Sequence, residues 1–252
     1  RKQLNTMKRV PRVDGRLAAR EHLDFDQEAR KIFSSLKVDG SVGRGTYNPC
    51  DPIWCHPVSG GTLFVGNHRA ASNIDVLDQH GITHVINCTS NMANFHAKTG
   101  KIAYFRFDVS GWWREIKGTG ETARKKVLEF TTDMLNFVGS ALSAGKNVLV
   151  HCAAGAHRAG TTGVILLMHF MSLDATRATM LAQKLRPIIN PIGTLPQLLE
   201  KVEDTNTKYP PISRFPASHF GGLESDSSGA PSKEEVAEAI DKGFVDTNVQ
   251  NQ

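Results

Sequence analysis

The sequence predicts an α/β protein, a three-layer sandwich in which helices flank a central, mostly parallel sheet. Apolar runs of strand length alternate along the chain with longer amphipathic runs, which is typical of parallel strands joined by helical crossovers. The most apolar strand, at 147–150, is followed by a loop of small residues and then by a long apolar run at 164–171. With 252 residues, 40% of them hydrophobic, the chain can form one domain with extensions.

Residues 1–47 are expected to form a basic arm and a helix. Residues 1–20 carry seven Lys or Arg residues against Asp14 and little apolar material. Residues 21–37 place apolar side chains at about helical spacing, so we expect a helix that packs on the core. Residues 40–61 are rich in Gly and Pro and are interpreted as a loop leading into the domain.

Residues 48–212 are expected to form the main domain. The apolar and β-branched runs predict strands at 62–65, 84–89, 102–109 and 147–150. Helices are expected at 72–80 with Ser72 as N-cap, at 121–143, and from Arg158 onward. Two more are expected at 174–186, capped by Asp174, and after Thr194, with Pro196 in the first turn. Residues 110–120 are interpreted as a loop.

Residues 213–252 are interpreted as a flexible acidic tail. Residues 224–252 carry seven acids against Lys233 and Lys242. Within the tail, Ser232 and Glu235 have the spacing of a capping box, which predicts a short helix to about Lys242. The overall charge of +5 and pI near 9.1 are compatible with phosphorylated substrates, and nothing in them demands nucleic acid.

The loop at 152–158 carries the chemistry. A tight strand–loop–helix turn directs consecutive backbone N–H groups and the positive end of a helix dipole at one point, which suits a tetrahedral dianion. Cys152 lies at the head of the loop in the same positive field, which favours its thiolate. Arg158 ends the loop with a planar fork that can bind two phosphate oxygens. Together they predict nucleophilic attack on phosphorus, with phosphate bound by the residues at Ala153, Ala154, Gly155, Ala156, His157 and Arg158.

The run from His151 to Arg158 resembles the signature loop of the cysteine-based protein phosphatases, the protein-tyrosine-phosphatase superfamily. It is most similar to the compact, atypical dual-specificity type. Residues 61–67 and 81–89 are similar to the opening strand–helix–strand of that family, and residues 185–191 with 197–199 to its closing segment. The resemblance implies the phosphatase fold, no cofactor, and hydrolysis of phosphotyrosine and phosphoserine or phosphothreonine in proteins through a phosphocysteine intermediate.

The resemblance also implies an Asp that serves as general acid and base, and this sequence departs from the family there. The family's Asp would fall at Gly111, which is not an acid. Asp108, three residues earlier, is the candidate, with Glu115 and Glu121 further along. Asp108 could equally be an Asp at a strand end that binds backbone N–H groups. Trp112 and Trp113 either wall the substrate entrance or pack on the domain's own flank.

A second departure follows Arg158, where the family has a Ser or Thr whose hydroxyl stabilises the departing thiolate. Ala159 occupies that position, and Thr161 or Thr162 could substitute. The plant glucan phosphatases, which share the fold, also carry Ala there. His151 is expected to orient Cys152 through a hydrogen bond, and His157 either contacts substrate or faces solvent.

The four cysteines show no disulfide-framework spacing, and a thiolate nucleophile needs a reducing compartment, so we expect the cytoplasm, or an organelle after removal of a transit peptide. Cys88 is either a core residue or the partner of Cys152 in a protective disulfide. Cys50, Cys55 and His56 suggest zinc, but no second ligand pair accompanies them, and no metal is expected. The longest apolar run is too short to span a bilayer.

The leading hypothesis is therefore a dual-specificity protein phosphatase that acts on phosphorylated proteins, with Cys152, Arg158 and Asp108 as catalytic residues. Two alternatives remain open at this stage. Gly111 and Ala159 together favour a catalytically weak pseudophosphatase that binds phosphate as an interaction module. Ala159 alone is compatible with a glucan phosphatase. The sequence does not define the oligomeric state.

Overall fold

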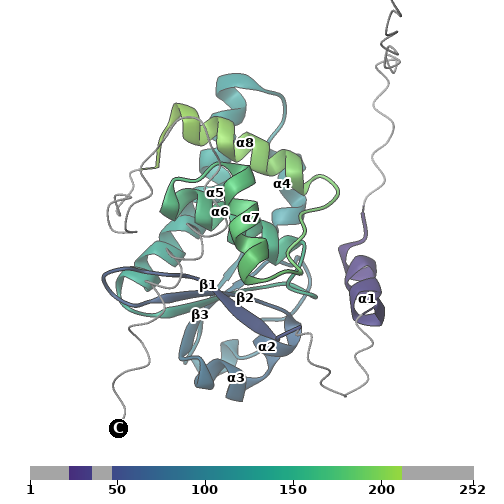
Figure 1. Cartoon of the computed structure of the whole chain (residues 1–252), viewed down its shortest axis with the longest axis vertical. Coiled ribbons are helices and arrows are strands. Elements are labelled where there is room, and N and C mark those ends of the chain that lie inside the picture. The colour runs from purple at the N-terminus through teal and green to yellow at the C-terminus, as the bar shows by residue number, and fades with distance from the viewer. Residues whose placement is uncertain (1–22, 36–46, 212–252) are drawn as a thin grey trace, which may run out of the picture.

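The computed structural model describes residues 23–35 and 47–211, and within these ranges the chain forms a three-layer α/β sandwich (Figure 1). Its five-stranded sheet has the order β1-β2-β5-β3-β4. The strands are β1 (Cys50–Cys55), β2 (Thr62–Gly66), β3 (Ile82–Asn87), β4 (Ala103–Arg106) and β5 (Asn147–His151). Neighbouring strands are parallel except for β1, which runs antiparallel to β2. The predicted fold class is confirmed.

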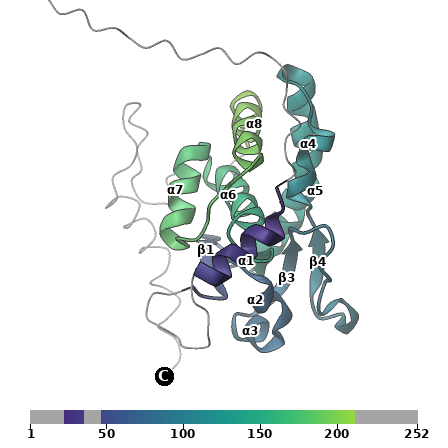
Figure 2. The same ribbon diagram turned by 90° about the vertical axis from the view of Figure 1, so that its right-hand side faces the viewer.

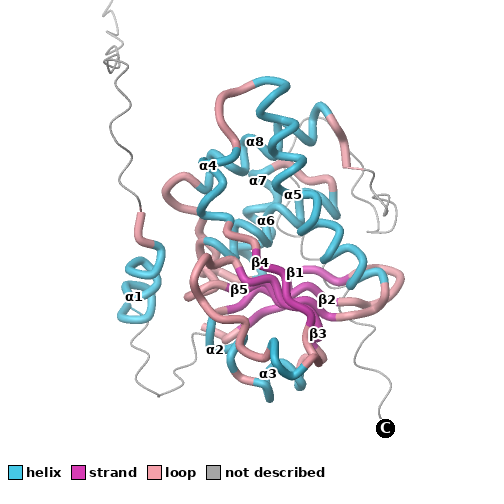
Figure 3. The backbone as a smooth tube through the Cα atoms, turned by 180° about the vertical axis from the view of Figure 1, so that it is seen from behind, coloured by secondary structure: helices cyan, strands magenta, loops and turns pink. Residues whose placement is uncertain are grey.

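Helices cover both faces of the sheet, and the strand β5 lies in its centre (Figure 3). The helices are α1 (Phe25–Ser35), α2 (His68–Ser72), α3 (Ile74–Gln79), α4 (Trp112–Glu115), α5 (Gly120–Ser143), α6 (Arg158–Met171), α7 (Ala175–Leu185) and α8 (Leu195–Lys208). The larger core lies between the sheet and α5 to α8, and α6 is buried along almost its whole length. A smaller core joins the other face to α2 and α3.

The strand β1 was not predicted, because residues 40–61 read as a loop. Pro52 lies inside the strand, and the register shifts between Pro52 and Trp54. An edge strand tolerates a proline, because one side of its backbone has no partner to bond. A proline that breaks the apolar run therefore concealed an edge strand.

The start of the helix expected at 72–80 was also wrong. Asn67 caps α2, its side-chain oxygen accepting from the N–H groups of Arg69 at 2.9 Å and Ala70 at 3.1 Å. Asn73 caps α3 in the same way, and Ser72 is the last residue of α2. Asparagine is as good an N-cap as serine, and an asparagine caps each of these two helices.

The strand expected at 102–109 is shorter, and the expected loop after it is partly helical. β4 ends at Arg106, which pairs with Asn87, the last residue of β3, so the strand has no partner beyond it. A 3₁₀ turn (η2, Val109–Gly111) and α4 follow. Trp112 is buried and donates from Nε1 to Thr194 Oγ1 at 3.2 Å. Thr194 occupies the N-cap position of α8 as expected, but its side chain accepts from Trp112 and makes no capping bond to the helix.

Most of the remaining elements agree with the sequence, but β3 was expected at 84–89 and lies two residues earlier, and a short 3₁₀ turn before β4 was not predicted. Helices α5, α6 and α7 and strand β5 fall where they were expected, and Asp174 Oδ1 caps α7 through the N–H of Arg177 at 2.7 Å. Pro196 lies in the first turn of α8. α1 occupies the middle of the predicted helix at 21–37, and a short 3₁₀ turn (η1, Ala97–Thr99) precedes β4.

Two expectations lie outside the described residues, namely the basic arm at 1–20 and the acidic tail with its capping box at Ser232. Among the residues that the structure does describe, no single helix is long and apolar enough to cross a membrane. Only α6 and α7 taken together pass by length and composition, and they are bent by 117° relative to each other.

Candidate active site

The loop at 152–157 joins the central strand β5 to the buried helix α6. It therefore lies at the carboxyl edge of the parallel strands, where open α/β sheets bind ligands. Arg158 is the first residue of α6, so the positive end of that helix faces the loop. The predicted nucleophile and the predicted phosphate-binding arginine are thus brought to the two ends of one turn.

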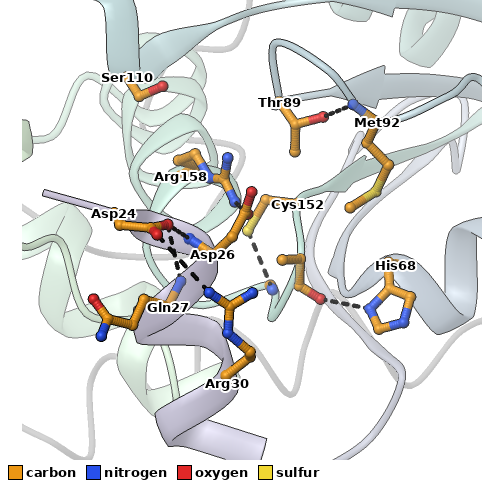
Figure 4. Close-up of polar contacts among 12 residues, drawn as sticks. Asp24, Asp26, Gln27, Arg30, His68, Thr89, Met92, Ser110, Cys152 and Arg158 are labelled. Atoms are coloured by element: carbon orange, nitrogen blue, oxygen red, sulfur yellow. Dashed lines mark hydrogen bonds and ion pairs between the residues drawn. The ribbon is translucent and has the colours of Figure 1, made fainter.

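The carbonyl groups of residues 153–156 are bound by groups from outside the loop. Four groups provide these bonds: His68 N–H to Ala153 at 3.1 Å, the Tyr47 hydroxyl to Ala154, Arg186 Nε to Gly155 at 3.0 Å, and Asn190 N–H to Ala156 at 3.1 Å. His68 Nδ1 also lies 3.0 Å from the Ala153 oxygen (Figure 4). With the carbonyls turned outward, the N–H groups of the loop are left free to face inward, as an anion-binding nest requires.

Gly155 places one of these N–H groups on the cysteine. Its backbone N–H donates to Cys152 Sγ at 3.3 Å, which favours the anionic sulfur (Figure 4). Gly155 has φ +67°, and a Cβ there would lie 2.4 Å from the carbonyl oxygen of Gly66. Only glycine fits this bend.

Arg158 points into the site, and a carboxylate from α1 already binds it. Arg158 Nη2 donates to Asp26 Oδ1, while the side chain of Arg158 is 5% exposed and that of Asp26 is 41% exposed. Arg158 Nε is buried and makes no hydrogen bond. One edge of the fork is therefore paired by a residue that the sequence did not single out, and one donor remains unused.

The loop is buried on all sides. Cys152 is only 3% exposed, because the loop is packed between the sheet and α1. Ala29 of α1 forms a small apolar cluster with Ala153, Ala154 and Ala156. Figure 4 shows Asp26 of α1 beside Cys152 and Arg158. The structure therefore shows a phosphate-binding loop that α1 covers.

Arg186 supports the loop from outside and is itself 1% exposed. Besides the Gly155 carbonyl, it binds the Asn48 carbonyl at 3.1 Å and the Asp51 carboxylate. Its guanidinium carbon lies 5.3 Å from the ring centre of Tyr47, within cation–π range. The closing segment at 185–191 thus holds the middle of the loop.

Asp108 lies beside the position where the resemblance expected an acid. A Cβ built on Gly111 would lie 3.1 Å from Asp108 Oδ2, so the carboxylate occupies the space next to residue 111. Ser110 Oγ donates to Asp108 Oδ1 at 2.6 Å, and Asp108 makes no capping bond to backbone N–H groups. The ordinary interpretation of Asp108 as a capping residue is therefore not supported. Glu121 instead accepts from the Tyr209 hydroxyl, next to α8.

The two histidines of the loop are both buried. His157 does not face solvent, as one of the two interpretations expected, because it is buried and its Nδ1 lies 2.5 Å from the Asn190 carbonyl oxygen, and its contact with substrate stays a prediction. Burial lowers the pKa of His151 to about 3, against a smaller opposing effect of the Cys152 backbone. Both ring nitrogens of His151 are buried and make no hydrogen bond of good geometry, and the contact with the Cys152 backbone is the only sign of the expected bond, so the orientation of Cys152 by His151 stays a prediction. His151 is a neutral residue of the core.

Neither Thr161 nor Thr162 directs its hydroxyl proton at Cys152 in place of the one missing at Ala159. Thr161 Oγ1 donates to the His157 carbonyl at 2.7 Å, and Thr162 Oγ1 donates to the Arg158 carbonyl at 3.1 Å. Cys88 is fully buried and donates to Thr162 Oγ1 at 3.3 Å. Burial raises the pKa of the Cys88 thiol strongly, which fits a core residue. The disulfide with Cys152 stays a hypothesis.

Trp112 packs inside the domain, so it does not wall an entrance, and Trp113 is 42% exposed with Arg114 over its ring at 5.2 Å. The residues suggested for zinc have other roles. His56 Nδ1 accepts from the N–H of Ser59 at 3.1 Å, and Cys50 packs in the smaller core. Within residues 23–35 and 47–211, no group of three or more His, Cys, Asp or Glu side chains could hold a metal ion.

Comparisons with known proteins agree with this geometry. A family model described as the catalytic domain of dual specificity phosphatases matches residues 63–204, which is more than half of the chain. The chain belongs to the dual specificity phosphatase family. Human dual specificity protein phosphatase 6 is 27% identical over 198 residues, covering 78% of this chain and 47% of that protein. Human dual specificity protein phosphatase 9 is 30% identical over 139 residues, covering 55% and 34%.

The chain thus spans about half the length, or less, of these two relatives. Among solved structures, human DUSP28 has a TM-score of 0.50 at 20% identity, covering 64% of this chain and 97% of that one. A mouse dual specificity phosphatase complexed with zinc tungstate has a TM-score of 0.50 at 22% identity, covering 67% and 95%. At these identities the structures support the fold of this dual specificity phosphatase and not its substrate.

Sequence reasoning missed the residues that reach the loop from elsewhere. Asp26 and Tyr47 lie more than 100 positions from the loop residues they bind. Asp26 is one of three acids at the start of α1 and carries no signal of its own. Arg186 did stand within a motif shared with the family, which is the one signal that could have found it.

Proposed function

We propose that this chain hydrolyses phosphate monoesters on tyrosine and on serine or threonine of proteins, with Cys152 as nucleophile. The observation that carries the proposal is the nest itself. The carbonyls of residues 153–156 are tied outward, the Gly155 N–H is directed at Cys152 Sγ, and Arg158 ends the same turn. This arrangement suits a sulfur anion and the equatorial oxygens of a phosphoryl group.

In the first step the sulfur anion of Cys152 attacks phosphorus. The S–P bond forms as the ester P–O bond breaks, and Asp108 donates its proton to the departing oxygen. Arg158 Nε and Nη2 and the loop N–H groups bind the phosphoryl oxygens, whose charge rises in the transition state. In the second step a water molecule gives a proton to Asp108 and attacks phosphorus, the S–P bond breaks, and inorganic phosphate leaves.

Asp108 is proposed as the acid because its carboxylate occupies the space beside Gly111. The family model and the two relatives named above are described as dual specificity phosphatases, and none of them favours the two alternatives, a phosphate-binding module or a glucan phosphatase. The four cysteines are all free thiols, which is consistent with a reducing compartment such as the cytoplasm.

The test is release of phosphate from an aryl phosphate and from an alkyl phosphate. Cys152→Ser is expected to abolish both. Asp108→Asn should lower kcat on the alkyl ester about 10²- to 10⁴-fold, and much less on the aryl ester, whose leaving group hardly needs a proton. Asp78→Asn, an exposed acid on α3, is the matched control. Equal losses on both esters would remove Asp108 from the role. The enzymatic proposal would be contradicted if neither the wild type nor Asp26→Ala, which frees Arg158 from the carboxylate of α1, releases phosphate in a way that depends on Cys152.

A further inference from the structure

Helix α1 lies across the loop end of the sheet, on the side of the molecule that Figure 2 presents to the viewer. Its apolar residues recur at helical spacing and face the domain. Phe25 and Ala29 are buried, and Ile32 and Phe33 pack against the cluster formed by Ala29 and the loop alanines. The contact therefore extends over the two and a half turns from Phe25 to Phe33.

The individual contacts place this helix on the phosphate-binding loop and on the residues beside it. The Phe25 ring lies 6.4 Å from that of His157, and the guanidinium carbon of Arg158 lies 5.6 Å from the Phe25 ring centre. At the other end, Phe33 packs edge-on against His68, whose backbone and ring hold the Ala153 carbonyl.

Asp26 places a carboxylate on Arg158, where the proposed mechanism needs a phosphoryl group. It occupies Nη2 of Arg158, a donor that the proposed mechanism assigns to a phosphoryl oxygen. The N-cap of α1 fixes this carboxylate, because Asp24 Oδ1 accepts from the N–H groups of Asp26 at 2.9 Å and Gln27 at 3.0 Å. A phosphoryl oxygen that takes the same N–H of Nη2 has to displace this carboxylate.

We propose that α1 is an intramolecular pseudosubstrate: it occupies the surface on which a phosphorylated polypeptide docks, and Asp26 takes the place of a phosphoryl oxygen on Arg158. This inference rests on the proposed function of the site. Only eleven residues separate Ser35 from Tyr47, so the local concentration of the helix is high, on the order of millimolar for a short tether. A substrate must displace α1 to reach Cys152.

Two variants should release the helix. Asp26→Ala removes the carboxylate and leaves a good helix former in the first turn. Ala29→Lys puts a charged side chain where the buried methyl group contacts Ala153, Ala154 and Ala156. The matched control is Lys31→Ala, because the Lys31 side chain is exposed and pairs with Glu28 on the same helix.

Access to the site is measured independently of turnover by the rate at which iodoacetate, an anionic alkylating reagent, modifies Cys152 in the full-length chain, followed by mass spectrometry. We expect both release variants to react roughly tenfold faster than the wild type, a factor that corresponds to about 1.4 kcal/mol. Lys31→Ala should react at the wild-type rate. Equal rates in all four chains would overturn the proposal.

Phosphate release from an aryl phosphate separates the remaining outcomes. Faster alkylation with faster phosphate release supports both the pseudosubstrate and the phosphatase. Faster alkylation without any release supports the pseudosubstrate and contradicts the phosphatase. Slower release in Asp26→Ala, with the greater loss on alkyl esters, would overturn the pseudosubstrate, because Asp26 would then be supplying protons. Asp26→Asn also removes the negative charge, so we expect the same change in the alkylation rate and in phosphate release as for Asp26→Ala.

Discussion

Replacement of Arg186 offers the sharpest test of how the loop is held. Arg186→Met removes the bonds to the Gly155 and Asn48 carbonyls and the ion pair with Asp51. Breaking a buried pair costs about 3–5 kcal/mol. Here the lower end applies, because Asp51 is 17% exposed and still accepts from Asn48 Nδ2 at 2.7 Å. We therefore expect a loss of about 3 kcal/mol in the free energy of unfolding.

Arg186→Lys isolates the geometry from the charge. Lysine can keep the ion pair with Asp51, but it lacks the fork that also reaches Gly155, so about 1–2 kcal/mol should be lost. Urea unfolding followed by Trp fluorescence measures both values. Arg177→Met, which breaks a half-exposed pair with Asp174, is the control and should cost about 0–1 kcal/mol. If Arg186→Met costs no more than this control, or if Arg186→Lys costs nothing, the loop is not held by the fork.

Two further predictions concern the loop and its flanks. Ala159→Ser restores a hydroxyl after Arg158. Where hydrolysis of the phosphocysteine limits turnover, we expect a roughly tenfold rise in kcat, measured by phosphate release. An unchanged kcat would mean that this step does not limit the rate. In the folded chain the pKa of His151 is about 3, below its ordinary 6.5. Between these pH values the unfolded chain binds a proton that the folded chain does not, so the free energy of unfolding decreases as the pH falls. Unfolding in urea at pH 7 and pH 4.5 should show a steeper loss for the wild type than for His151→Gln, by about 1.4 kcal/mol per pH unit at most, and parallel losses would refute the assignment.

The features that the sequence predicts well are those encoded by neighbouring residues. The strand at 147–151, the turn at Gly155 and the helix from Arg158 follow one another without interruption, so propensity and spacing alone define the nest. The same holds for α7, where Asp174 directly precedes the helix that it caps. The local pattern failed where the structure of a segment depends on its place in the fold. β1 is an example, because its Pro52 is tolerated only since the strand lies at the edge of the sheet.

The features that the sequence could not reveal depend on distant contacts. Nothing in residues 21–37 says which surface their apolar face will cover, since many surfaces suit Phe, Ala and Ile side chains. The burial of His157 depends on the Asn190 carbonyl, 33 positions away, so a loop histidine looked available for substrate. Asp108 is intermediate, because the acid was found by counting, and its place beside Gly111 came only from the folded backbone.

The small side chains of the loop serve both the nest and the helix that covers it. Ala153, Ala154 and Ala156 let the backbone turn tightly, and the same methyl groups form the surface on which Ala29 lies. A larger residue in the loop would alter phosphate binding and helix docking together, so substitutions there cannot separate the two. Substitutions on α1 can, since Asp26 and Ala29 contribute nothing to the position of the loop carbonyls, which His68, Tyr47, Arg186 and Asn190 hold from other elements.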